Sequence, residues 1–214
     1  MSSMVSAVRT HLRIAWCAFK LHRRVLVLSV LILVGSWVIL ELTVVALHRF
    51  GVVLNVVLHL AFLVLFAGLM VGIHSIALQA VDGRSPTLKS LTSLLARGPT
   101  YLLAMCLYCL AVAGGLLLLV VPGVYFAVRY ALFGHVLAAR QASAVEALRA
   151  AGSLSQGRWW AVSRLLLAVS ALNIAGVALL GLGLLISFPV ALLATASLFR
   201  TLHRPTNPAS PIAA

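Results

Sequence analysis

Residues 117–135 read LLLVVPGVYFAVRYALFGH, and this stretch decides the fold. An apolar run meets Pro122-Gly123 and then continues, which predicts two apolar helices joined by almost no loop. Arg129 lies seven residues past Pro122, inside the second apolar segment. A charged side chain is costly inside a membrane, so the role of Arg129 depends on where the bilayer lies.

The composition favours a membrane protein. The chain has 214 residues, of which 63% are hydrophobic and 9% charged, with a mean hydropathy of +1.15. An ordinary soluble domain is about 25% charged. A soluble helical bundle would have to hide several apolar stretches of about 20 residues, the length that spans a bilayer. We therefore expect an all-α integral membrane protein.

Six apolar segments are visible, and consecutive segments meet in pairs at tight turns. We expect six transmembrane helices arranged as three antiparallel hairpins. The segments cover residues 25–47, 52–80, 100–121, 123–140, 160–181 and 184–202. The predicted outer turns are marked by Gly51, Pro122, Gly123 and Gly181.

The distribution of basic residues sets the orientation. Residues 1–24 contain five Lys and Arg, and residues 81–99 and 139–159 contain three each, whereas the tight turns together contain only Arg49. Because basic residues concentrate on the cytoplasmic side, both termini are expected in the cytoplasm, as in a multi-pass protein of a bacterial inner membrane. The formal net charge of +13 lies mostly between apolar runs, which argues against a nucleic-acid partner.

The stretches between the hairpins have amphipathic periodicity. In residues 4–22, 87–97 and 143–155 apolar side chains recur on one helical face, which predicts an interfacial amphipathic helix before each hairpin. The alternative is a solvated loop with a helical turn. Basic and aromatic residues are expected to anchor the chain at the interface. These anchors are Arg23, Arg24, Tyr101, Arg158, Trp159 and Trp160.

The same pattern occurs three times along the chain. Residues 1–204 are predicted to form a single transmembrane domain, with repeat-like units of about 1–80, 81–140 and 141–204. Each unit enters from the cytoplasm, so the repeats would be parallel. Residues 205–214 form a proline-rich tail that we expect to be disordered.

Two motifs resemble a group of bacterial membrane proteins. LLLLVVPGVYFAVRYALFGHVLA at 116–138 and AVEALRAAGSLSQGRWWAV at 144–162, with DGRSPTLKSL upstream, resemble YciC-like proteins and the membrane domain joined to some glycerophosphodiester phosphodiesterases. The likeness covers about residues 80–165, with Ala151 where the group often has serine. It implies a multi-helix membrane protein. The phosphodiesterase activity does not follow, because it needs clustered carboxylates and this chain has three acidic residues.

Four polar residues are predicted to share one layer in the outer half of the bilayer. Counting back from the outer turns at about 1.5 Å per residue places Glu41, His59, Arg129 and Asn173 at similar depths. We expect Glu41 and Arg129 to form a buried ion pair that holds two helices together. The alternatives are a polar ligand or ion site, and an Arg129 side chain that reaches the interface.

The sequence contains no pattern typical of catalysis or metal binding. Cys106 and Cys109 lie in an apolar run without ligand partners, so we expect packing residues, no metal, no cofactor and no enzymatic activity. Two functions remain open. One is a structural or accessory subunit of a membrane assembly, in contact with lipids and with other membrane subunits or a second copy. The other is a small transporter or permease unit for a lipid or small amphiphile.

Overall fold

The computed structural model describes residues 2–47, 51–178 and 183–203, and no strand occurs in these ranges. Six helical stretches among the described residues are long and apolar enough to cross a membrane. The prediction of an all-α chain with six such helices is therefore confirmed. The spans are Val8–Leu47, Val52–Val81, Lys89–Leu118, Val120–Ala139, Trp159–Ala178 and Leu184–His203. The predicted turn residue Gly181 and the tail 205–214 lie outside the described residues.

The helices follow one another with short connections. Their bounds are α1 Ser2–Leu47, α2 Val52–Val81, α3 Lys89–Thr92, the 3-10 helix η2 Leu95–Arg97, α4 Gly98–Leu118, α5 Val120–Tyr130, α6 Phe133–Ala139, α7 Ala144–Ser155, α8 Trp159–Ala178 and α9 Leu184–His203.

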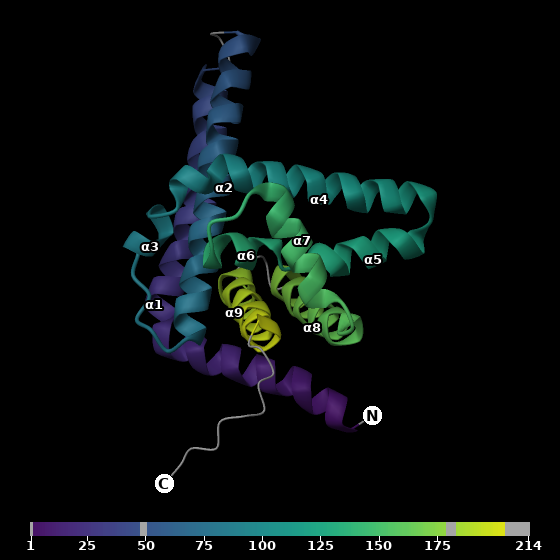
Figure 1. Cartoon of the computed structure of the whole chain (residues 1–214). Helices are drawn as coiled ribbons and strands as arrows, with labels where there is room; N and C mark the ends of the chain where they lie inside the picture. The colour runs from purple at the N-terminus through teal and green to yellow at the C-terminus, as the bar shows by residue number, and fades with distance from the viewer. Residues whose placement is uncertain (1, 48–50, 179–182, 204–214) are drawn as a thin grey trace.

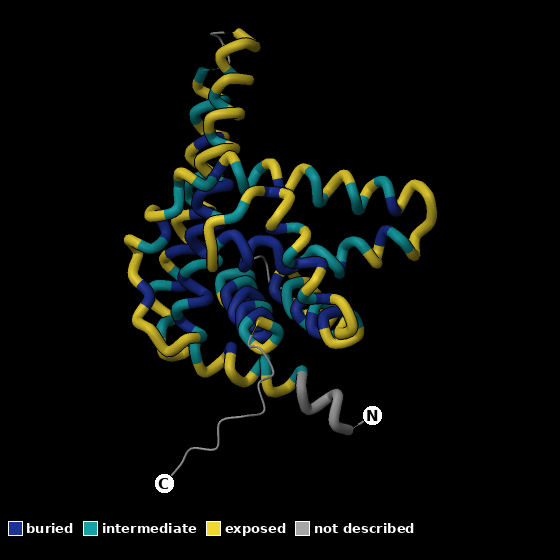
Figure 2. The backbone as a smooth tube through the Cα atoms, viewed as in Figure 1, coloured by how far each residue is buried: buried dark blue, intermediate teal, exposed yellow. Residues whose placement is uncertain are grey.

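Three helix pairs extend in different directions from a common base, which consists of residues 2–22, α6 and α7 (Figure 1). Helices α1 and α2 form one arm, α4 and α5 a second, and α8 and α9 are seen nearly end-on. Within the first arm the Trp37 ring packs edge-on against Phe62 and Phe66, with centroids 5.7 and 6.0 Å away. Buried residues concentrate near the base, whereas the outer ends of the first two arms are exposed (Figure 2).

Helix α1 is kinked where the amphipathic segment meets the apolar one. His22 has non-helical backbone angles, φ −114° and ψ 21°. The segment before it forms one side of the base, with Ala15 and Phe19 buried and Trp16 45% exposed. The His11 imidazole Nδ1 lies 2.8 Å from the Ser197 hydroxyl, so this segment is held against α9. The predicted stripe is thus mostly a packing face of the protein.

The turn between α4 and α5 lies three residues before the predicted position. The extended residue is Leu119, with φ −167° and ψ 151°. Pro122 is the third residue of α5, where a backbone N–H would have no helical acceptor, so proline starts the helix instead of breaking the chain. Gly123 packs against Gly115, where an added Cβ would lie 2.8 Å from the Gly123 backbone. Two glycines therefore let α4 and α5 touch beside the turn.

Two predicted interfacial helices differ from expectation. Residues 87–97 form only the one-turn α3 and the 3-10 helix η2, and Leu91 is 1% exposed in the core. Helix α7 forms as predicted but buries its small-residue face, while Val145 is 46% exposed. The apolar face of residues 143–155 was expected to meet the headgroup layer, and that stays a prediction; the packed face of α7 consists of small side chains, which let the helix approach its neighbours closely. The buried residues of α7 are Ala144, Ala147, Ala151, Gly152 and Ser155.

Candidate functional site

The four polar residues predicted to share a layer are not brought together. Glu41 is exposed on α1, and His59 is exposed on α2, where its Nδ1–H donates to the Asn55 carbonyl at 2.8 Å. Asn173 is half-buried on α8. Glu41 and His59 belong to the first arm, Arg129 belongs to the second and Asn173 lies on α8; because these arms diverge, similar depth along each helix does not bring the four residues together (Figure 1).

Arg129 does not form the predicted ion pair with Glu41 among the residues that the structure describes. Its guanidinium is held by aromatic side chains instead. Arg129 Nη1 donates to the Tyr125 hydroxyl at 2.8 Å, and the guanidinium carbon lies 5.6 Å from the Tyr125 ring centre and 5.8 Å from that of Tyr130. Tyr125 in turn stacks on Trp159 at 6.5 Å. Ring faces attract a cation electrostatically, so the charge is stabilised by cation–π contacts.

The sequence places these groups locally. Tyr125 precedes Arg129 by one helical turn, so the two side chains share a face of α5. The Ser155 hydroxyl of α7 donates to the Arg129 carbonyl at 3.0 Å, next to the break between α5 and α6. Arg129 Nε is buried without a hydrogen-bond partner. This arrangement gives a cation with a free donor near the point where the second arm joins the base.

The predicted interface residues fall into two groups. Arg23, Arg24, Arg158 and Trp160 are exposed, and Trp159 is partly buried, with its ring against those of Trp160 and Tyr125. Tyr101 instead packs inward, with its ring centre 6.1 Å from that of His74 and 5.3 Å from that of Phe133. The prediction of Tyr101 as an anchor is wrong, because α4 begins at the base and turns this side chain toward the core.

A pair of histidines lies in the base, and sequence reasoning did not connect them. The rings of His74 on α2 and His135 on α6 meet edge to face, with centroids 4.7 Å apart. The Nδ1–H of His74 donates to the Met70 carbonyl at 2.6 Å, and His135 Nε2 lies 3.5 Å from the Thr195 hydroxyl. A Cβ on Gly134 would lie 2.6 Å from His74 Nε2, so glycine makes room for the imidazole. No spacing signal links residues 61 positions apart.

The histidine pair lacks the further ligands that a protein metal site needs. Within the described ranges no group of three or more His, Cys, Asp or Glu side chains is placed to hold a metal ion.

Two arginines join segments of the base. Among the described residues an ion pair joins Arg200 on α9 to Asp82 at the end of α2. Arg97 caps the end of α6, since its Nη1 donates to the carbonyls of Leu137 at 2.7 Å and Arg140 at 3.2 Å.

Comparison with known proteins adds no relative. No protein-family model matches the chain, and neither a curated protein nor a solved structure does so. The resemblance to YciC-like proteins therefore stays a prediction. The fold and composition define a helical protein with six helices able to cross a membrane.

Proposed function

We propose that this protein is a non-enzymatic, multi-pass protein of a bacterial inner membrane that serves as a structural or accessory subunit of a membrane assembly. In this proposal the three helix pairs are transmembrane hairpins that lie side by side in the bilayer, instead of diverging as they do in Figure 1, and both termini are cytoplasmic. The base, with its interfacial segments, lies at the cytoplasmic surface. The basic loops join the arms at the base, which agrees with the preference of Lys and Arg for that side.

The observation that supports a subunit role is the unused apolar surface of the second arm. In the most apolar stretch of the Lys89–Leu118 span only 11% of the residues are buried. The corresponding share for the Leu184–His203 span is 61%. Leu117, Leu118 and Val121 at its outer end are 88%, 79% and 78% exposed. A surface of this kind is covered by lipid or by other helices. Gly114, with open space around its Cα, would let a partner helix approach closely.

Cysteine cross-linking tests the subunit role. Cys106 is exposed on α4, so native membranes treated with a bifunctional maleimide should yield a discrete higher-mass species that contains this protein. Cys109 is also exposed on α4, so the species should disappear in the double variant Cys106→Ser/Cys109→Ser and persist in Cys17→Ser. A chain that remains entirely uncross-linked, although Cys106 and Cys109 react with a monofunctional maleimide, would contradict a partner on this arm.

A reporter fusion tests the orientation separately. A reporter after Arg204 should be active only in its cytoplasmic form, and one inserted at Gly51 or Leu119 only in its outer form. Cytoplasmic reporters at both turns would defeat the six-span topology.

A transporter for a lipid or small amphiphile is the second candidate. An apolar groove of about 350 Å³ between α1, α2 and α9 favours it. Its wall includes Trp37, Phe66, Met70 and Phe188. Purified protein in vesicles should then move a fluorescent lipid between leaflets without any partner, and Phe188→Trp, which fills the groove, should slow that movement. Absence of movement with correctly inserted protein would leave the subunit role as the better account.

A further inference from the structure

A second cavity, of about 230 Å³, lies in the base between α6, α7 and α9. One water molecule needs only roughly 10–15 Å³ of such space, so the cavity has room for a group much larger than water. One wall is apolar and comes from Val136, Ala150, Leu154 and Phe199, with Ala139 beside them. The polar side consists of Arg140, Ser153, Arg200 and His203.

The charge of this cavity is mainly positive. Two acidic side chains lie near its basic residues. Asp82 pairs with Arg200, and Glu146 is close enough to Arg140 and Arg149 for their charges to lower its pKa, although bonds to Ser143 are the larger cause. Each carboxylate is already engaged, Asp82 with Arg200 Nη2 and Glu146 with the Ser143 backbone N–H at 2.9 Å. An anion in the cavity would thus meet more cations than carboxylates.

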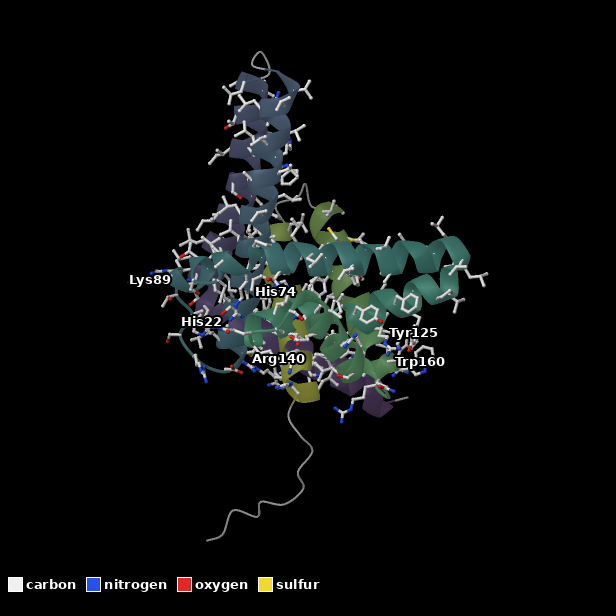
Figure 3. All side chains as sticks on the ribbon, turned by 45° about the horizontal axis from the view of Figure 1, so that its top comes forward. His22, His74, Lys89, Tyr125, Arg140 and Trp160 are labelled. Atoms are coloured by element: carbon white, nitrogen blue, oxygen red, sulfur yellow. The ribbon has the colours of Figure 1, made fainter. Side chains whose placement is uncertain are left out.

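Arg200 carries a donor that its ion pair does not use. Nη2 donates to Asp82 Oδ2, whereas Nε is buried without a hydrogen-bond partner. Leaving a buried donor unpaired is costly. Arginine presents its donors as a fixed fork that suits phosphate oxygens, so the Arg200 guanidinium can donate to a second anion while Nη2 donates to Asp82. Arg140 stands at the same cavity and is exposed (Figure 3).

We propose that this basic cavity binds a phosphate group, with Arg140, Arg200 and His203 as the recognising side chains. The apolar wall beside them matches the glycerol and first acyl carbons of an anionic phospholipid, whose phosphate would lie at the basic side. Basic pockets between helices on the cytoplasmic side of membranes are typical headgroup sites. A free inorganic phosphate shares the same chemistry and differs only in leaving the apolar wall uncovered.

Ligand-induced thermal stabilisation of the full chain in an uncharged detergent tests the proposal. Short-chain phosphatidylglycerol and inorganic phosphate are titrated separately, because a ligand that binds only the folded state raises Tm in a saturable way. We expect saturable stabilisation by the lipid, with an apparent Kd about tenfold weaker or more in Arg140→Gln. Arg84→Gln is the matched control, since Arg84 is exposed at the base but does not line the cavity, and its Kd should stay within twofold.

The second variant, Asp82→Asn, is expected to strengthen binding of the phosphate ligand, whereas Arg140→Gln weakens it. It releases Arg200 Nη2, so the apparent Kd for the phosphate ligand should fall even though the protein itself loses an ion pair. Saturable binding of inorganic phosphate, but not of the lipid, with the same Arg140 dependence would support the site and assign it to free phosphate. No saturable binding of either ligand, or equal losses in Arg140→Gln and Arg84→Gln, would overturn the proposal.

Discussion

Removing the Tyr125 hydroxyl should destabilise the second arm through Arg129. In Tyr125→Phe the 2.8 Å hydrogen bond from Arg129 Nη1 is lost, while the ring and its cation–π contact stay. The bond lies at an exposed position, so its net contribution is about 1 kcal/mol, inside the range for ordinary hydrogen bonds. Tyr125→Leu also removes the cation–π contact, about 0.5–1 kcal/mol at an exposed site, and the stacking on Trp159, about 0.5–1.5 kcal/mol.

A double-mutant cycle isolates the contact between the two side chains. Equilibrium unfolding in mixed detergent micelles is measured for the parent chain, Tyr125→Phe, Arg129→Gln and the double variant. The coupling free energy should be about 1 kcal/mol, above the roughly 0.3–0.5 kcal/mol by which independent sites deviate from additivity. The loss in Tyr125→Leu should be about 2–3.5 kcal/mol, the sum of the three contributions.

Glu41→Gln provides the matched control, since an ion pair with Arg129 was expected from the sequence. Glu41 is exposed on a different arm, so the Glu41–Arg129 coupling should be zero within about 0.5 kcal/mol. A coupling larger for Glu41 than for Tyr125 would refute this account of Arg129. Additive losses for Tyr125 and Arg129 would refute the hydrogen bond.

Three other predictions use the same unfolding measurement. Gly115→Ala should lose about 1–3 kcal/mol because its Cβ would meet the Gly123 backbone, whereas Gly114→Ala, with nothing within 4 Å, should be neutral or stabilising. Leu91→Ala should lose about 2–5 kcal/mol, since this side chain is 1% exposed, and a loss below 1 kcal/mol would contradict a core position. Ser143→Ala should lose about 0.5–2 kcal/mol by removing the capping box of α7. Bonds to Ser143 hold the pKa of Glu146 below its usual value, so this cap stabilises fully above that value and weakens as pH falls through the lowered pKa, a dependence that Ser143→Ala should reduce.

The local rules worked where the chain acts on its nearest neighbours. Amphipathic periodicity predicted a helix over residues 143–155, and α7 forms there, starting at a capping box of Ser143 and Glu146. The same rules misplaced the second turn, because Pro122 suits both a turn and the first turn of a helix. The break falls at Leu119, whose side chain carries no turn signal. Beside this break Gly115 and Gly123 let the backbones of α4 and α5 meet.

The candidate sites required knowledge of which helices meet. Counting along each helix gave Glu41 and Arg129 a similar depth. Depth alone does not say how far apart two residues lie, and these two lie on arms that diverge. The contact between His74 and His135 and the cavity shared by Arg140 and Arg200 join segments far apart in the sequence. Neither has a spacing motif by which a single sequence reveals it.

The sequence by itself determined that this protein is helical and has six segments able to cross a membrane. Backbone N–H and C=O groups in an apolar run satisfy one another only within a helix, so length and apolar content are enough for that inference. The tertiary structure decided which face of each helix is buried and which cations share a cavity. In α7 the buried face consists of small residues, because small side chains let two helix backbones approach closely. Hydropathy does not measure side-chain size, so it does not predict which face of α7 is buried.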